Sequence, residues 1–194
     1  MALVLDGSAN TIGGLAVGGL PDGIVDSDMV ADSVTRITEF DQWYLSQNKS
    51  SNGNLTNFTR VSATWTGSAS QIGTGMEVSS EVWTFPSTGK WLVICNGQFN
   101  CNDSDNVIIY TQVSLDSGSS YANNGSAIDG NNDSSGGSRT GSAISFSFID
   151  VTNTGTIKVK FYADSIGSGS AVRGTTTVSG GMQTNVIFIR LGDT

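Results

Sequence analysis

The segment Trp83-Thr-Phe-Pro-Ser-Thr-Gly-Lys-Trp91 constrains the fold of this chain more than any other. Pro86 has no amide hydrogen for a sheet ladder, so it must lie at the edge or end of a strand. Gly89 supplies the backbone freedom that a turn needs. Beyond it the residues alternate, with Trp91, Val93, Cys95, Gly97 and Phe99 on one face and Leu92, Ile94, Asn96 and Gln98 on the other. The pattern predicts a short strand, a turn and a long strand.

Composition extends this prediction to the whole chain. The 194 residues are enough for one domain with a core, plus an extension. Hydrophobic residues make up 37% and charged residues 13%, and this balance is typical of short strands joined by turns. We expect strands at about 58–65, 76–85, 89–100, 107–115, 141–150, 156–164, 170–178 and 183–191. Antiparallel strands of this length predict an all-β sandwich or barrel.

Charge and the absence of histidine exclude several functions. The formal net charge of −8, without a lysine or arginine cluster, opposes binding to nucleic acid or to an anionic membrane. The chain has no histidine, so Ser-His-Asp and Cys-His catalysis and imidazole zinc sites are excluded. No segment is apolar enough to predict a membrane span, and residues 1–6 do not resemble a signal peptide.

The two cysteines are predicted to be free thiols. Cys95 and Cys101 lie on one predicted strand. At about 3.3 Å per residue their side chains would be roughly 20 Å apart, whereas a disulfide needs Cα atoms within about 7 Å.

The chain divides into three predicted parts. Residues 1–45 form an N-terminal anchor or assembly segment, 46–57 a polar linker loop, and 58–194 the β-sandwich. The first part has too little apolar area to fold alone. Within it, the near-repeat between Val25 and Val34 fits either a short degenerate repeat or a short capped helix, and residues 37–45 favour a strand.

The last predicted strand is apolar on both faces. Val186 and Phe188 share one face, and Ile187, Ile189 and Leu191 share the other. Because a strand buried on both sides needs a covering layer on each face, we expect neighbouring chains to supply one. The residues predicted at a trimer interface are Val186, Phe188, Trp91 and Phe99.

Residues 83–91 resemble the strand-turn-strand signature of the tumour-necrosis-factor-like jelly roll, in the version found in complement globular heads. The resemblance covers roughly residues 58–191, and the apolar final strand is similar to the one at the trimer axis of that family. It implies an antiparallel jelly-roll sandwich that assembles and binds rather than catalyses. Arg190 and the long polar segment 116–140 depart from the family pattern.

The whole chain also resembles structural proteins of tailed phages, particularly marine and cyanobacterial ones. The similarity lies in Met1–Gly7, Gly19–Gly23, Ile37–Trp43, Ile72–Met76 and Phe188–Thr194. It implies a virion protein with an N-terminal anchor and a C-terminal jelly-roll knob, usually trimeric. Leu3, Leu5, Leu15 and Leu20 are the predicted anchor residues, contacting other capsid or tail proteins.

Three groups of residues are candidates for a catalytic, metal-binding or ligand-binding site. Glu77 and Glu81 are four residues apart, but solvated strand-end charges explain them better than a glycosidase pair. Asp103 and Asp105 fit either a calcium loop or a hairpin turn, and the turn is favoured. In the segment 116–140, Tyr121, Asn123 and Asn124 could contact a glycan, or the segment is a surface excursion.

Two functions therefore stay open. The preferred one is a non-enzymatic, trimeric virion appendage without a cofactor, either a capsid-decorating or head-fibre knob or a tail-fibre knob. The alternative is a lectin-like adhesin or a glycan-degrading tail protein that attaches to the host surface.

Overall fold

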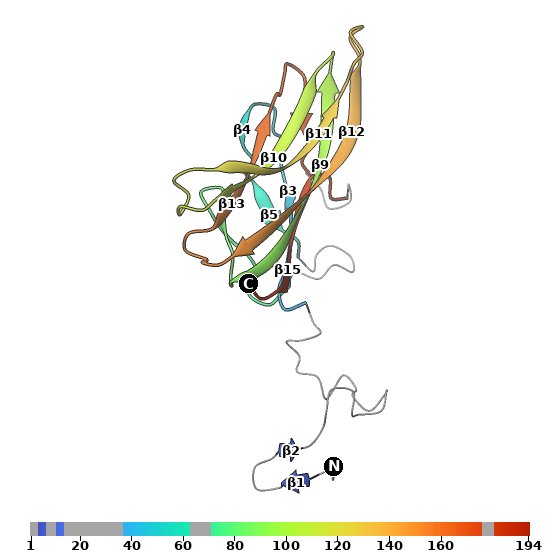
Figure 1. Ribbon diagram of the computed structural model, residues 1–194. Coiled ribbons are helices and arrows are strands. Elements are labelled where there is room, and N and C mark those ends of the chain that lie inside the picture. Colours follow the sequence, from blue (N-terminus) through green and yellow to red (C-terminus); the bar gives the residue numbers. More distant parts are fainter. Residues whose placement is uncertain (1–3, 7–10, 14–36, 63–70, 176–180) are drawn as a thin grey trace. The chain divides into compact units, whose positions relative to one another are not determined.

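The computed structural model describes residues 4–6, 11–13, 37–62, 71–175 and 181–194. The chain forms two units, 1–36 and 37–194. In the first, β1 (Val4–Asp6) pairs with β2 (Thr11–Gly13) as an antiparallel hairpin (Figure 1). The near-repeat between Val25 and Val34 lies outside the described residues, as do Leu3, Leu15 and Leu20. Leu5 is a member of β1.

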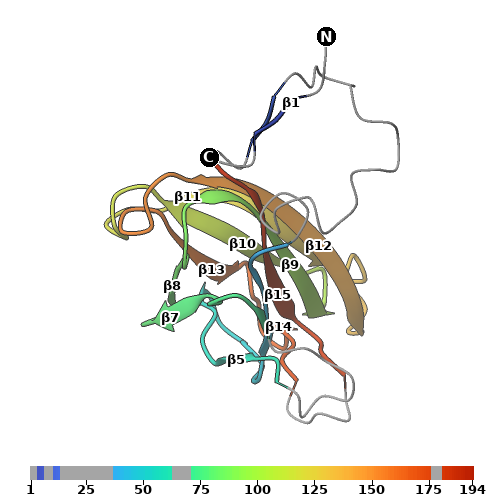
Figure 2. The same ribbon diagram turned by 90° about the horizontal axis from the view of Figure 1, so that it is seen from below.

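The second unit is a sandwich of two antiparallel sheets, and the described residues contain no helix (Figures 1 and 2). The seven-stranded sheet runs in the order β12 (Ser138–Val151), β9 (Gly89–Asn102), β15 (Asn185–Gly192), β3 (Phe40–Leu45) and β5 (Phe58–Arg60), with β14 (Ala171–Val172) on β9 and β6 (Gln71–Ile72) on β3. The six-stranded sheet runs β11 (Ala122–Gly130), β10 (Asn106–Ser114), β13 (Lys158–Asp164), β8 (Val82–Thr84) and β7 (Glu77–Ser79), with β4 (Gly53–Asn54) on β13. The prediction of an all-β antiparallel sandwich is confirmed.

The connection from β8 to β9 follows its sequence signature. Pro86 lies between the two strands, and Gly89 opens β9 with a φ of +140°. A Cβ atom at Gly89 would lie 2.5 Å from the carbonyl oxygen of Gly192, so this position needs glycine for space as well as for its backbone angle. Trp91 fixes the turn, because its Nε1–H donates to the Ser87 carbonyl at 3.2 Å.

The core lies between the sheets and is rich in aromatic rings. Trp83 on β8 is fully buried, with ring centroids 4.8 Å from Trp43, 5.1 Å from Phe188 and 6.0 Å from Phe161. These residues come from four strands in both sheets, so the cluster joins the layers. Such ring contacts add stabilisation beyond the area they bury.

The predicted boundary between anchor and domain is wrong. The compact unit begins at Ile37 rather than after residue 45, and β3 pairs with β15 inside the seven-stranded sheet. The alternation of β3 places Trp43 and Leu45 on the inner face, where both are buried. The prediction of a strand in 37–45 is therefore confirmed. The predicted linker 46–57 also belongs to the domain, because it contains β4 and the buried Leu55.

The interpretation of 116–140 as one long loop is also wrong, because it contains the nine-residue strand β11. β11 is an edge strand with turn-forming residues, and its buried member is Ala127. The predicted strand 76–85 is instead the β7–β8 hairpin, with a two-residue turn at Ser80 and Glu81. Of the predicted strand 170–178, the described part forms the two-residue β14.

Candidate assembly surface and pockets

The four residues predicted at a trimer interface lie inside a single subunit. Val186, Phe188 and Phe99 have no exposed surface, and Trp91 is 1% exposed. All four belong to the hydrophobic core cluster. A side chain without exposed surface cannot contact a neighbouring chain, so this prediction is wrong. β15 lies between β9 and β3, and Phe188 packs against Trp83 and Phe161 of the six-stranded sheet.

The opposite face of the same sheet carries a broad apolar surface. Alternate residues of β12, β9, β15, β3 and β6 point away from the six-stranded sheet. We call this the apolar outer face. Its residues are Phe40, Ile72, Leu92, Ile94, Ile144, Phe146, Phe148, Ile187 and Ile189.

Strand register arranges these side chains in rows across the sheet. One row follows the pairs that join Phe148 to Leu92, Leu92 to Ile189, and Ile189 to Phe40. The next row joins Phe146 through Ile94 to Ile187. Phe146 is 65% exposed and Phe148 is 59% exposed, whereas the outward apolar side chains of the middle strands β9 and β15 are half-buried. Two phenylalanines in water on an edge strand mark an interaction surface rather than scattered apolar residues.

Beyond the apolar outer face, the rest of the outward surface of the seven-stranded sheet is polar. Along β9 and β12 the outward pairs become Gln98 with Ser142, Asn100 with Thr140, and Asn102 with Ser138. The apolar rows therefore occupy one end of the sheet, and a partner that buries them need not desolvate the polar end.

The alternation Ile144, Phe146, Phe148 against Ser145 and Ser147 was clear in the sequence, but it did not show which set faces inward. In the structure the serines face the interior and are 5% and 1% exposed. β11 lies close to β12 there, and a Cβ atom on Gly125 would be 2.6 Å from Ser147 Oγ. Small side chains are therefore required at Ser145 and Ser147, whereas Ile149 and Val151 farther along the same inner face are large and buried in the core.

Asp103 and Asp105 lie in the β9–β10 hairpin loop, as the turn interpretation expected. The carboxylate of Asp105 accepts hydrogen bonds from the amides of Asn106 at 3.0 Å and Gly167 at 2.9 Å, so it holds the loop. Asp103 has a positive φ of 31°. Among the described residues, no three Cys, Asp or Glu side chains converge as a metal site would require.

The three candidate glycan residues lie at the start of β11 or just before it. Asn123 and Asn124 lie on β11 beside Tyr110, in a depression of about 160 Å³. Gln112 Nε2 donates to Asn123 Oδ1 at 2.8 Å. Tyr121 lies before β11, with Lys160 Nζ 4.1 Å from its ring centroid. Gln112 is paired with Lys160 across β10 and β13, so the Tyr121 ring and the Asn123 amide contact neighbouring residues of one sheet.

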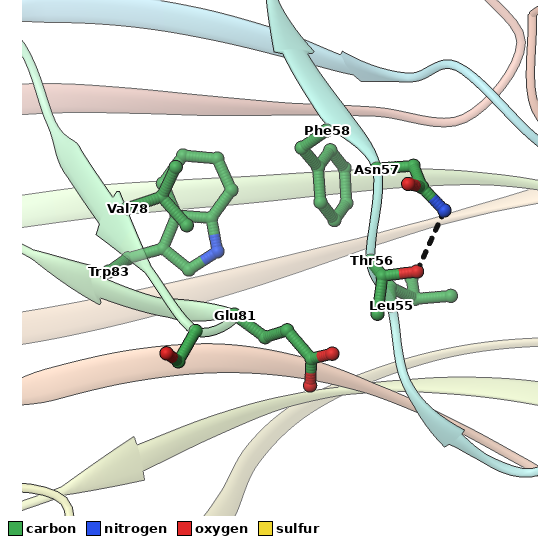
Figure 3. Close-up of a pocket in the computed structure, with 8 residues that line it drawn as sticks. Leu55, Thr56, Asn57, Phe58, Val78, Glu81 and Trp83 are labelled. Atoms are coloured by element: carbon green, nitrogen blue, oxygen red, sulfur yellow. Dashed lines mark hydrogen bonds between the residues drawn. The ribbon is translucent and has the colours of Figure 1, made fainter.

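A second pocket, of about 180 Å³, lies between the β7–β8 hairpin and the segment 55–58 (Figure 3). Its apolar lining consists of Leu55, Phe58, Val78 and Trp83, and its polar lining of Thr56, Asn57, Ser80 and Glu81. Glu81 contributes to this pocket whereas Glu77 does not, so the two glutamates do not face one cavity there. No signal in the sequence brings residues 55–58 to the hairpin.

Both cysteines are free and buried on β9, as predicted. Burial raises the pKa of Cys95 to about 12. Burial, with the nearby Asp129 carboxylate, also raises the pKa of Cys101. Both thiols are therefore protonated and unreactive at neutral pH. Among the described residues we find no helical segment with the length and hydropathy of a membrane span.

No protein-family model and no curated protein sequence matches the chain. Solved structures do match. The crystal structure of murine APRIL at pH 8.5 has a TM-score of 0.54 and 12% identity, and the match covers 79% of this chain and 98% of that one. Eiger TNF from S. frugiperda has a TM-score of 0.55 and 9% identity, over 80% and 93% of the two chains. At this identity the likeness establishes the fold, which is a tumour-necrosis-factor-like jelly roll.

Proposed function

We propose that this chain is a non-enzymatic structural protein whose 37–194 domain assembles into a homotrimer through the apolar outer face, as part of a bacteriophage particle. One observation carries the proposal. Two adjacent rows of apolar side chains cross the seven-stranded sheet on the face that the subunit itself leaves uncovered.

In this trimer, Phe146 and Phe148 contribute most to the free energy of association, because they are the most exposed of the apolar side chains on this face. Fully burying one such side chain stabilises an assembly by about 1.5–3 kcal/mol. Three copies of Phe146 and Phe148, with the half-buried Ile94, Leu92 and Ile189 beside them, offer a large apolar area for association.

A second copy of the chain is the favoured occupant. The two rows contain no ionised side chain, so identical subunits with a net charge of −8 can meet there without placing like charges in contact. Homo-oligomers with closed symmetry dominate soluble assemblies. The choice of three copies rests on the jelly-roll fold and on the sequence resemblance to complement-type heads, which implies a trimer.

The non-enzymatic role rests on the sequence. A chain without histidine lacks the commonest general base, and association through an apolar face needs no reactive group. The proposed role depends on stability and shape.

The virion assignment rests on the sequence resemblance to phage structural proteins. In this proposal residues 1–36 fasten the trimer to other capsid or tail proteins, since the domain begins at Ile37. The knob is then a capsid-decorating, head-fibre or tail-fibre module. Purified particles of the encoding phage should contain the chain at a copy number divisible by three. Particles without the chain would overturn the virion role and leave the trimer intact.

The trimer is tested by a matched pair of substitutions. Phe146→Asp places a charge within the apolar outer face. Ile128→Asp makes the equivalent change at an isoleucine that is 52% exposed on β11, in the other sheet. We expect sedimentation equilibrium to give a trimer for Ile128→Asp and a folded monomer for Phe146→Asp, with circular dichroism confirming the β fold of each. A trimer that survives Phe146→Asp would show that this face is not the interface.

A further inference from the structure

The pocket between the β7–β8 hairpin and the segment 55–58 is unrelated to the apolar outer face. None of its lining residues belongs to that surface. Figure 3 shows the indole nitrogen of Trp83 and the carboxylate of Glu81 on the side of the hairpin that faces Phe58 and Thr56. The pocket therefore exists in a single subunit, and its function can be considered apart from assembly.

The hairpin that forms one wall has an unusual turn. Ser79 pairs with Val82, which leaves a two-residue turn with positive φ values of 49° at Ser80 and 70° at Glu81. Turns of this kind favour asparagine and glycine, because other residues adopt this backbone at an energetic cost. The third strained residue of the lining, Asn57, has a φ of 62°. Glycine would adopt the backbone angle of Glu81 with less strain, so the presence of glutamate at this position indicates a function for its side chain.

The carboxylate of Glu81 is held in place but not neutralised. Its Oε2 atom accepts a hydrogen bond from Asn54 Nδ2 at 2.7 Å. In the described part of the chain it forms no ion pair, although the residue is half-buried while its neighbours 77–80 are exposed. A positively charged group would complement this carboxylate, which Asn54 holds in place and which no cation pairs with among the described residues.

The rest of the lining is suited to an apolar stem. Leu55, Phe58 and Val78 form the apolar walls, and Val78 is 38% exposed. The Nδ2 atom of Asn57 donates to Thr56 Oγ1 at 2.8 Å, so part of the polar rim is already satisfied. The ionised acceptor of the pocket is therefore the Glu81 carboxylate.

We propose that this pocket binds an alkylammonium group, with the charge at Glu81 and the stem against Phe58 and Val78. The Glu81 carboxylate then pairs with the ammonium charge, and Phe58 and Val78 remove the apolar stem from water. An anion would be repelled by the carboxylate. A neutral sugar is less suitable, because Trp83 has no exposed ring surface on which to stack.

The proposal is tested by titrating the full, ¹⁵N-labelled chain with n-butylammonium chloride, n-butanol and glucose, and following the Trp83 indole resonance, which a Trp83→Phe variant identifies. We expect a saturable shift with n-butylammonium, a dissociation constant at least tenfold weaker for n-butanol, and no shift with glucose. Equal binding of butanol, or saturation with glucose, would overturn the assignment.

Glu81→Gln tests the carboxylate and keeps an oxygen for Asn54. It should weaken n-butylammonium binding about tenfold. Glu77→Gln is the matched control, because Glu77 is an exposed glutamate on the same hairpin outside the pocket. If Glu81→Gln does not fold, salt replaces it: added NaCl should weaken butylammonium binding to the natural chain and leave butanol binding unchanged. Equal loss in both glutamine variants, or no salt effect, would contradict the proposal.

A second arm distinguishes the source of the group. Nα-acetyl-lysine amide carries the same ammonium on a peptide backbone. Binding at least as tight as that of n-butylammonium assigns the pocket to a lysine of a partner protein. Binding of n-butylammonium alone assigns it to a free amine. If neither amine binds, the proposal fails.

Discussion

The two sheets of the sandwich have similar inner faces and different outer faces. The central strands β9 and β13, one in each sheet, alternate strictly and bury their inward residues. The outer face of the six-stranded sheet is mainly polar: Lys160 lies over Tyr121, and Gln112 donates to Asn123. The outer face of the seven-stranded sheet instead carries the exposed Phe146 and Phe148.

This difference shows that alternation identifies the two faces of a strand but not which one is the core. Between Ile144 and Phe148, β12 has its large apolar residues outside and its serines inside, whereas β9, paired with it along its length, has Trp91 and Phe99 inside. β11 lies close to the inner face of β12 at Ser147 and leaves little room for a larger side chain there. On the outer face, Phe146 and Phe148 are exposed. Which residues form the core and which are available to a partner follows from this assignment of the two faces.

The largest expected effect comes from the inner face of β15. Phe188→Ala removes a fully buried ring that packs 5.1 Å from Trp83 and 6.4 Å from Phe85. We expect the free energy of unfolding to fall by about 3–5 kcal/mol. Urea denaturation followed by tryptophan fluorescence measures this. A loss below about 1 kcal/mol would mean that Val186 and Phe188 do not face the core.

The next effect compares a buried ion pair with one whose carboxylate is exposed. Asp41 is 1% exposed and accepts hydrogen bonds from Arg60 Nε at 3.1 Å and the Met76 amide at 2.7 Å. Arg60→Leu leaves this buried carboxylate without its cation and should cost about 2 kcal/mol. The matched control is Asp193→Asn, which removes the partner of Arg190 at a position that is 92% exposed. It should leave the free energy of unfolding almost unchanged. Equal effects in the same denaturation assay would contradict the burial of Asp41.

A smaller effect of opposite sign is expected at Ser147. Its hydroxyl is buried and has no hydrogen-bond partner among the residues that the structure describes. Ser147→Ala removes an unpaired polar group without enlarging the side chain, so the free energy of unfolding should rise by about 1 kcal/mol or stay constant. A loss above about 1 kcal/mol would indicate a buried partner, such as a water molecule.

The smallest effect concerns the polar side of the molecule. Hydrogen bonds from the Ser120 and Ser114 hydroxyls lower the pKa of Asp116 from 3.8 to about 2. Because the folded pKa is below the unfolded one, the resulting stabilisation is complete above pH of about 4 and is lost as the pH falls through about 2. NMR titration of the Asp116 carboxyl carbon should give this low midpoint, and Ser120→Ala should raise it. An unchanged midpoint in Ser120→Ala would show that this hydrogen bond does not set the pKa.

The sequence predicted the architecture because strand periodicity and turn residues are local. Pro86 and Gly89 marked the β8–β9 turn, and the spacing of Cys95 and Cys101 excluded a disulfide. The edge strand β11 was missed because Asn123, Asn124 and Gly125 favour turns, and tertiary pairing with β10 overrides that preference.

The candidate sites could not be predicted, because they are formed by contacts between segments that are distant in the sequence. The trimer residues were assigned to the wrong face, since no local pattern shows that β15 is a central strand. The alkylammonium pocket joins residues 55–58 to Glu81 across two segments whose proximity comes from the fold. Glu81 was visible as a charge near a turn, but its half-buried position was not.

The most direct test of the central claim is the mass of the unmodified chain in dilute solution. Sedimentation equilibrium across micromolar concentrations should give three times the chain mass, because the proposed trimer buries the apolar outer face between subunits. A well-folded monomer over that range would show that Phe146 and Phe148 remain in water, and it would contradict the proposed assembly.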